Sequence, residues 1–144
     1  MFQLDPELES FRQEARKMAE RAFAAKAAYW DEEEIYPAEN LKLLAELGYL
    51  GLVIPEAYGG SGAPIIQGTI LLEEIARVCF NTALVAQGAI NGPSRAITIL
   101  GNEEQKKRWL PGCVSGENIF GIGISEPGAG SAMTDMITSA TPDG

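Results

Sequence analysis

The chain has 144 residues, 46 % of them hydrophobic, which is enough for a domain with a packed core and argues against disorder. Eleven basic residues stand against 20 acidic ones, a formal net charge of −9, so nucleic acid and anionic membranes are not expected as partners. The absence of histidine removes Ser-His and Cys-His catalysis and most zinc or iron sites, and no metal site is expected. No apolar run reaches the length of a membrane span and no secretory signal is visible, so we expect a cytoplasmic protein. Cys79 and Cys113 lie in apolar contexts, which favours reduced core thiols over a disulfide.

Apolar residues recur at steps of three and four along most of the chain, the spacing of helices with one buried face. We expect helices over residues 5–28, 37–48, 64–79, 82–100 and 102–110. The third is apolar nearly all round, as in a helix central to a bundle. The acidic run 31–34 is expected to be a solvated loop.

Particular residues mark where these helices begin and end. Asp5 is a typical cap for the first helix, and Asn81 is expected to cap the fourth. Gly92-Pro93 predicts a kink within the fourth, because proline removes one hydrogen bond of the helix. Residues 102–105 resemble a capping box, and Pro111-Gly112 is expected to end the helix that this box starts.

Two connections between helices carry distinct patterns. Residues 50–55 form a short apolar run that proline closes, which predicts a buried extended segment. Residues 56–62 contain three glycines and could form a phosphate loop, but no helix with Lys or Ser/Thr follows at the required offset, so a structural connection is favoured. Glu73 and Arg77 are four residues apart on a helix, a spacing at which they can pair.

The composition changes after residue 113, where glycine and β-formers replace helix formers. Residues 119–125 alternate with period two, which predicts a strand. Ile122 and Ile124 fall on one face, while Gly121 and Gly123 leave the other almost bare. A bare face lets a flat group approach the backbone, because glycine has no Cβ.

A loop with two glycines and a hydroxyl follows at residues 127–131. Such a loop can turn several N–H groups towards one anion, so strand and loop together suggest a nucleotide-like cofactor, with a tight bend or a close backbone crossing as the alternative. Residues 136–140 read as a second strand and 142–144 as a turn. We therefore expect a mainly α chain: an all-helical domain over 1–113, then at 114–144 the incomplete beginning of a β-domain cut from a longer α+β protein.

Four stretches together resemble the acyl-CoA dehydrogenase family of FAD flavoproteins in order and in spacing. They read IPEAYGGSG at 54–62, EEIAR at 73–77, GNEEQKK followed by WLP at 101–111, and GISEPGAGS at 123–131. The last is similar to the flavin-binding signature of that family. One departure is that the family usually has Asp directly after the Gly-Ser pair, where this chain has Ala132.

The resemblance implies roles for individual residues. The backbone at Ile122 and Ile124 and the hydroxyl and N–H of Ser125 would face the isoalloxazine ring of FAD. The N–H groups of Gly130 and Ser131, with the Ser131 hydroxyl, would meet its pyrophosphate. Hydrogen bonds at the pyrimidine end of the ring would stabilise the charge that develops there, while the redox chemistry belongs to the cofactor.

The resemblance also implies a reaction: oxidation of an acyl-CoA thioester to the 2,3-enoyl thioester. A carboxylate removes the α-proton in this family, and we expect that base beyond residue 144, so that this stretch has no catalytic residue and is inactive alone. The small, apolar half-helix 84–89 could line an acyl pocket, with plain helix packing as the default interpretation. Candidate substrate contacts are Val85, Gly88 and Ser131.

Partners follow from the same resemblance: an acyl-CoA substrate, an electron-transfer flavoprotein or similar acceptor, and further copies of the chain in a homotetramer. The alternatives stay open at this point. One is a carrier-protein thioester dehydrogenase or a flavin monooxygenase of the same fold. The others are a cofactor-free helical interaction module and an inactive scaffold.

Overall fold

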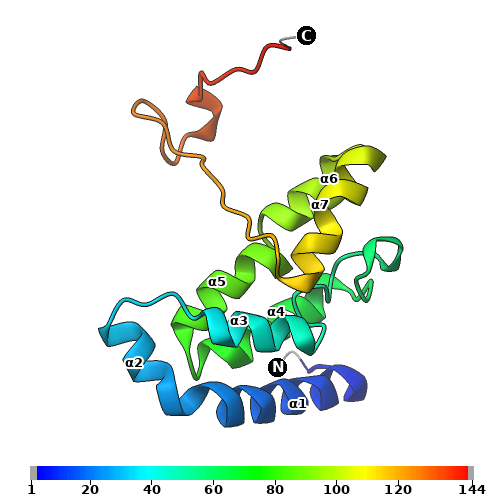
Figure 1. Ribbon diagram of the computed structural model, residues 1–144, viewed down its shortest axis with the longest axis vertical. Helices are drawn as coiled ribbons and strands as arrows, with labels where there is room; N and C mark the ends of the chain where they lie inside the picture. Colours follow the sequence, from blue (N-terminus) through cyan, green and yellow to red (C-terminus); the bar gives the residue numbers. More distant parts are fainter. Residues whose placement is uncertain (1–2, 143–144) are drawn as a thin grey trace.

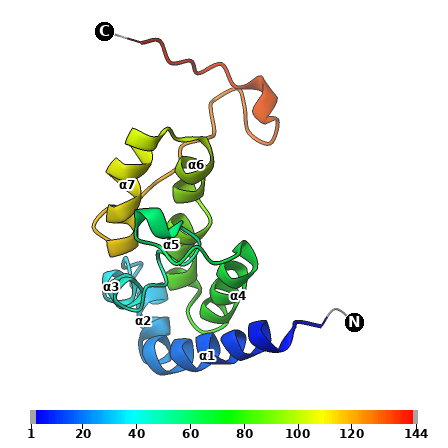
Figure 2. The same cartoon turned by 90° about the vertical axis from the view of Figure 1, so that its right-hand side faces the viewer.

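The computed structural model describes residues 3–142 and is mainly helical. Short 3-10 turns lie at Ala24–Lys26 (η1), Glu56–Tyr58 (η2) and Met133–Asp135 (η3). The helices are α1 (Pro6–Phe23), α2 (Ala27–Glu32), α3 (Ala38–Glu46), α4 (Ile65–Ala76), α5 (Phe80–Ile90), α6 (Pro93–Leu100) and α7 (Glu103–Ser115). In Figures 1 and 2, α1 lies across one end of the helical body and α6 and α7 form the other end.

The core lies between α1, α3, α4 and α5. Phe23, Leu44, Leu71, Ile75 and Ile90 are almost wholly buried in it. On α1, alanines at 15 and 19 are fully buried, and such small side chains allow a neighbouring helix to approach closely. The mainly helical fold that the sequence predicts is therefore confirmed.

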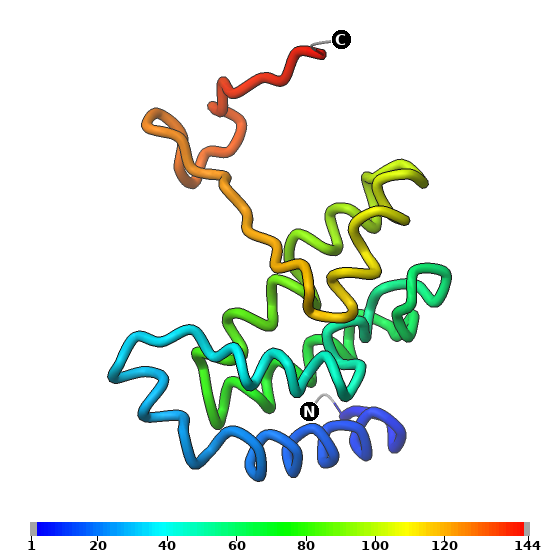
Figure 3. Tube along the Cα trace, in the orientation of Figure 1, coloured from blue at the N-terminus to red at the C-terminus, as the bar shows by residue number. Residues whose placement is uncertain are grey.

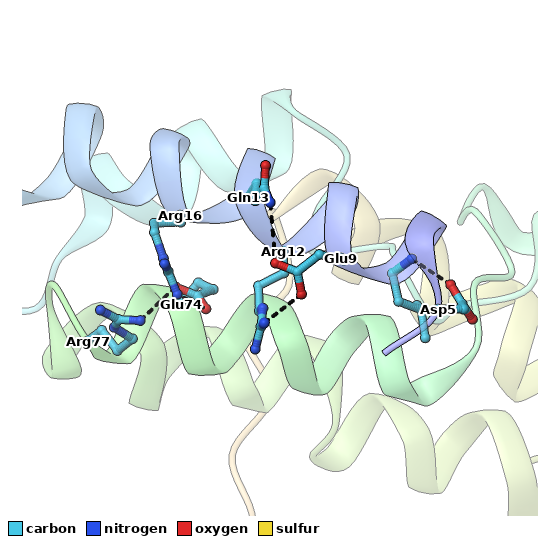
Figure 4. A network of polar contacts seen from close by, with 8 residues as sticks. Asp5, Glu9, Arg12, Gln13, Arg16, Glu74 and Arg77 are labelled. Carbon is cyan, nitrogen blue, oxygen red and sulfur yellow. Dashed lines mark hydrogen bonds and ion pairs between the residues drawn. The ribbon is translucent and has the colours of Figure 1, made fainter. Parts of the chain in front are cut away.

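A buried carboxylate joins α1 to α4 (Figure 4). The Arg16 guanidinium donates to both Glu74 oxygens, at 2.8 and 3.0 Å, and the Glu74 side chain is 1 % exposed. Arg77 lies 3.6 Å from the same carboxylate. Arg77 thus pairs with the buried neighbour Glu74, in place of the pairing with Glu73 that the sequence spacing allows.

The first predicted helix divides before its expected end. α1 ends at Phe23, and the chain passes through η1 into α2, which extends to Glu32. The acidic run 31–34 begins in α2, and all its side chains are exposed, as expected of a solvated segment. Asp5 caps α1 as predicted, accepting from the N–H of Leu8 at 2.8 Å.

The predicted fourth helix is two helices separated at Gly92. Pro93 starts α6 and cannot donate to the Ala89 carbonyl four residues earlier; the buried Ser94 hydroxyl donates to that carbonyl instead. Asn81 does not cap α5, which begins after Cys79. The Asn81 amide donates to the backbone oxygen of Trp30 at 3.0 Å, so it ties α5 to α2.

α7 begins as predicted and ends later than predicted. Asn102 and Gln105 form both bonds of the capping box, at 2.9 Å each. The helix continues past Pro111 to Ser115 and ends at Gly116, whose φ of +77° is the left-handed conformation that glycine adopts without strain. Proline therefore does not stop this helix.

The glycine-rich connection 56–62 is structural, as favoured from the sequence. The N–H groups of Ser61 and Gly62 donate to the carbonyls of Gly51 and Ile54, at 3.0 and 2.8 Å. A Cβ on Gly60 would lie 2.0 Å from the Ile54 oxygen, so only glycine fits there. Residues 50–55 make successive turns that supply these carbonyls, and the predicted extended segment is wrong.

The last part of the described chain leaves the helical body. Residues 117–142 run outward from α7, and Figure 3 shows this path as the orange-to-red tube. Within residues 3–142 no strand forms, so the expected strands at 119–125 and 136–140 are not seen; one isolated bridge joins Glu126 and Ala129. Cys79 and Cys113 are free and buried, as predicted. None of the described helices is long and apolar enough to cross a membrane.

Candidate functional site

The predicted ring-facing segment is extended and lacks pairing. Within the described chain, residues 119–125 exchange no backbone hydrogen bonds with another segment. A Cβ on Gly121 or Gly123 would meet no atom within 4 Å, so one side of this backbone is open. On the predicted apolar face, Phe120 packs against the cluster of Ile54, Leu110 and Cys113. Ile124 is partly buried, whereas Ile122 is 66 % exposed.

The predicted phosphate loop begins with a tight turn. The backbones of Glu126 and Ala129 exchange both hydrogen bonds, at 3.0 and 3.1 Å, and Ala129 is buried. Gly130 and Ser131 follow on the exposed side. Within residues 3–142 their N–H groups donate to no other group of the chain, so they are available to an anion.

The Glu126 side chain holds the far end of this loop. Its carboxylate accepts the N–H groups of Ile137 and Thr138, at 2.9 and 2.8 Å. Donors aimed at a carboxylate favour its charged form, and these bonds hold the pKa of Glu126 below its usual range.

A cavity of about 300 Å³ lies between residues 118–120, the start of the segment that leaves α7 (the outgoing segment), and the helices α5 and α3. Val85 and Gly88, both predicted substrate contacts, line it together with Leu41 and Phe120. A Cβ on Gly88 would lie 3.4 Å from the Phe120 carbonyl oxygen, so the absence of a side chain helps to keep this space open. The third predicted substrate contact, Ser131, is not among the residues that line the cavity.

Sequence reasoning missed several residues of this cavity. Tyr36 and Lys42 bring polar groups from the α2–α3 connection and from α3, and Asn118 brings one from the segment after α7. Burial raises the pKa of the Tyr36 hydroxyl. No periodic signal could have found them, because the outgoing segment meets α3 only in the folded chain.

The described walls of the cavity contain no carboxylate side chain. Cys113, behind the wall at Ala89, is buried, and burial raises the pKa of its thiol to about 11, which leaves it protonated and unreactive at neutral pH. Within residues 3–142 no cluster of His, Cys, Asp and Glu side chains could hold a metal ion.

Comparison with known proteins places the chain in a family. Residues 5–117 match the family model "Acyl-CoA dehydrogenase, N-terminal domain". The chain belongs to the acyl-CoA dehydrogenase family, a family of flavoproteins and oxidoreductases, and supplies its N-terminal helical domain.

Relatives and solved structures agree with this membership. The 3-sulfinopropanoyl-CoA desulfinase of Cupriavidus necator is 38 % identical over 144 residues, which is 100 % of this chain and 36 % of the relative. The glutaryl-coenzyme A dehydrogenase in complex with glutaryl-CoA superposes with a TM-score of 0.83 at 34 % identity, over 94 % of this chain and 35 % of that one. The acyl-CoA dehydrogenase of Bacillus anthracis in complex with FAD gives a TM-score of 0.81 at 28 % identity, over 92 % of this chain and 23 % of that one. The chain thus spans only about a third of the curated relatives it matches.

Proposed function

We propose that this chain carries the acyl-end pocket and the first flavin contacts of an FAD-dependent acyl-CoA dehydrogenase. The observation that carries the proposal is that the cavity and the open backbone lie on one continuous stretch of chain. Ile119 and Phe120 line the cavity beside Val85 and Gly88, and the bare backbone of Gly121 and Gly123 follows directly. An acyl group in the cavity would therefore end next to a surface that accepts a flat ring.

The described residues fit FAD. The open side at 121–123 has room for the ring, and the Ser125 hydroxyl and the backbone of Ile122 and Ile124 lie along the same segment. The free N–H groups of Gly130 and Ser131 suit the pyrophosphate. When bound, FAD would accept the hydride that leaves the β-carbon of the thioester.

The contribution of this chain would be positioning. The apolar cavity binds the alkyl end by removing it from water. The segment 119–125 holds backbone dipoles beside the ring, and the loop fixes the phosphates. We infer that the α-proton goes to a carboxylate outside residues 1–144, so the 144-residue chain alone should not turn over acyl-CoA, with or without an added electron acceptor.

The cavity predicts how a substitution should act. In the protein expressed at the full length of its gene, Gly88→Leu should fill the space beside Phe120 and raise KM for acyl-CoA at least tenfold, with FAD content unchanged. The matched control is Gln87→Leu, one residue earlier on α5, which faces the groove towards α4 instead. Steady-state assays with an artificial acceptor measure both. An unchanged KM in Gly88→Leu would remove the acyl end from this cavity.

A relative favours a second candidate reaction. The Cupriavidus necator protein, 38 % identical, is a 3-sulfinopropanoyl-CoA desulfinase. The same pocket would then hold a short thioester whose end bears a sulfinate, and Lys42 at its wall is a cation of suitable sign. Release of sulfite from 3-sulfinopropanoyl-CoA, without reduction of an acceptor dye, would establish this reaction and displace the dehydrogenase.

Partners belong to the proposal as well. We propose an electron-transfer flavoprotein as the acceptor and a homotetramer as the assembly, on the family resemblance of the four motifs. A carrier-protein thioester in place of acyl-CoA, or a monooxygenase reaction, would leave the same pocket and ring surface. A colourless full-length protein would favour the cofactor-free interaction module or the inactive scaffold.

A further inference from the structure

We propose that Glu126 is the positioning residue of the cofactor loop: its carboxylate clamps the chain at Ile137 and Thr138 and thereby holds Gly130 and Ser131 in place. This inference rests on the proposed function, because it assigns the loop to the FAD pyrophosphate. It concerns a side chain that otherwise has no part in the chemistry.

One residue, Glu126, makes contacts at both ends of the loop. The backbone of Glu126 pairs with Ala129 and closes the tight turn at the start of the loop. Its carboxylate, at 2.9 and 2.8 Å, accepts the N–H groups of Ile137 and Thr138 beyond the end of the loop. The intervening residues, which include η3, are therefore held at both ends by Glu126.

No other carboxylate in the described loop does the same. The position after Ser131 is Ala132, which has no acceptor to offer. The Asp135 carboxylate meets only the hydroxyl of its neighbour Thr134, at 3.4 Å. The loop thus depends on Glu126 for its long-range closure, and charge-assisted bonds to backbone N–H groups are among the stronger ones in proteins.

The reach of the side chain matters as much as its charge. Glu126→Asp keeps the charge but shortens the chain by one methylene, so it cannot meet both N–H groups. Glu126→Gln keeps the length but offers one carbonyl oxygen in place of two equivalent acceptors. We expect Glu126→Asp and Glu126→Ala to open the loop fully and Glu126→Gln to retain part of its closure.

Amide hydrogen exchange measured by NMR on the 144-residue chain tests the clamp. The amides of Ile137 and Thr138 should exchange at least tenfold faster in Glu126→Ala and Glu126→Asp than in the unsubstituted chain. Glu117→Ala, which removes an exposed carboxylate nine residues earlier, should not change them. Equal exchange rates in the unsubstituted chain and Glu126→Ala would overturn the clamp.

Titration of the full-length gene product with FAD, followed by flavin fluorescence, tests the positioning role. Glu126→Ala should weaken FAD binding at least tenfold, Glu126→Gln should restore part of it, and Glu117→Ala should bind as the unsubstituted protein. Loss of amide protection with unchanged FAD affinity would overturn the positioning role and leave a contact that only shapes the loop. If the unsubstituted full-length protein binds no FAD, the proposed function fails and the positioning role with it, while the exchange experiment still decides whether the clamp exists.

Discussion

Glu74 is a charged side chain in the buried part of the fold, where glutamate is seldom found unless it is paired. Its carboxylate is 1 % exposed, yet it accepts two hydrogen bonds from Arg16 and lies near Arg77. Removing one partner of such a contact costs more than the pair contributes net, because the other partner is left without its counter-charge. The contact ties the chain across 58 positions, from α1 to α4.

We expect Glu74→Gln to destabilise the chain by about 2 kcal/mol, since hydrogen bonds to charged groups contribute on the order of 1.5–3 kcal/mol. Urea unfolding followed by circular dichroism measures the change. Glu73→Gln, which alters the neighbouring but exposed carboxylate in the same way, should shift the midpoint far less. Equal midpoints in the two variants would show that the buried contact does not stabilise the fold.

The same contact sets a pH dependence. The Arg16 hydrogen bonds hold the pKa of Glu74 below its usual range, with the charges of Arg16, Arg77 and Arg12 acting in the same direction and burial opposing them. A carboxylate whose pKa is lower in the folded state stabilises it above the unfolded value, and that stabilisation is lost as pH falls through the folded pKa. The stability difference between the unsubstituted chain and Glu74→Gln should therefore be constant from pH 5 to 8 and shrink below about pH 4.5. A constant difference down to pH 3 would contradict this assignment.

At the scale of elements, the junction of α5 and α6 shows how one helix becomes two. Pro93 leaves the Ala89 carbonyl without its usual donor, and the buried Ser94 hydroxyl replaces that donor. The Cys113 thiol approaches the same carbonyl at 4.0 Å from α7. The junction also shapes the cavity, because Ala89 lines it.

Replacing Ser94 with Ala should lower the free energy of unfolding by about 1–2 kcal/mol, because the partly buried Ala89 carbonyl loses its hydroxyl donor. Ser115→Ala is the control, since the exposed Ser115 hydroxyl donates to a carbonyl within α7 and water can replace it. Thermal unfolding of both variants gives the comparison. An unchanged transition in Ser94→Ala would mean that another group satisfies the Ala89 carbonyl.

Local signals predicted the existence of the helices better than their ends. The caps at Asp5 and Asn102 were readable because the capping atoms lie within three residues of each other. Asparagine is a common capping residue, but the Asn81 amide donates to the backbone oxygen of Trp30, 51 residues away, instead. Proline commonly ends a helix, yet α7 continues past Pro111 to Ser115. Contacts between distant segments decide such cases, and spacing alone does not contain them.

The candidate site likewise has features that could be predicted from the sequence and features that depend on contacts between distant segments. The bare backbone face at Gly121 and Gly123 could be predicted from the sequence, and a Cβ added at either position would meet no atom within 4 Å. Val85 and Gly88 do share one cavity, but Tyr36, Lys42 and Asn118 enter it only through tertiary packing. The flavin and substrate roles of the site residues remain predictions, since they depend on groups that the described chain does not hold.

At the scale of the whole molecule, the described chain has two parts: a packed helical body and an extended segment that leaves it. The helical body has a closed core, whereas the chain after Phe120 runs outward from it through residues 121–142 (Figures 1 and 2). Apolar side chains on this part, such as Ile122 and Ile137, are exposed. A strand needs backbone partners on a neighbouring extended segment, and within residues 3–142 no second extended segment pairs with either of the expected strands at 119–125 and 136–140. The expected strands are therefore absent for a physical reason: a strand forms only with a neighbour.

The most direct test of the account is the visible absorption spectrum of the full-length gene product, unsubstituted and with Gly123→Val. A Cβ at this position meets no protein atom, so the valine should leave the fold and its thermal unfolding unchanged while it occupies the space assigned to the ring. We predict a yellow flavoprotein for the unsubstituted chain and a folded, colourless protein for Gly123→Val. A colourless unsubstituted protein in excess FAD, or equal flavin content in the two proteins, would contradict the claim that the bare side of residues 119–125 receives the flavin.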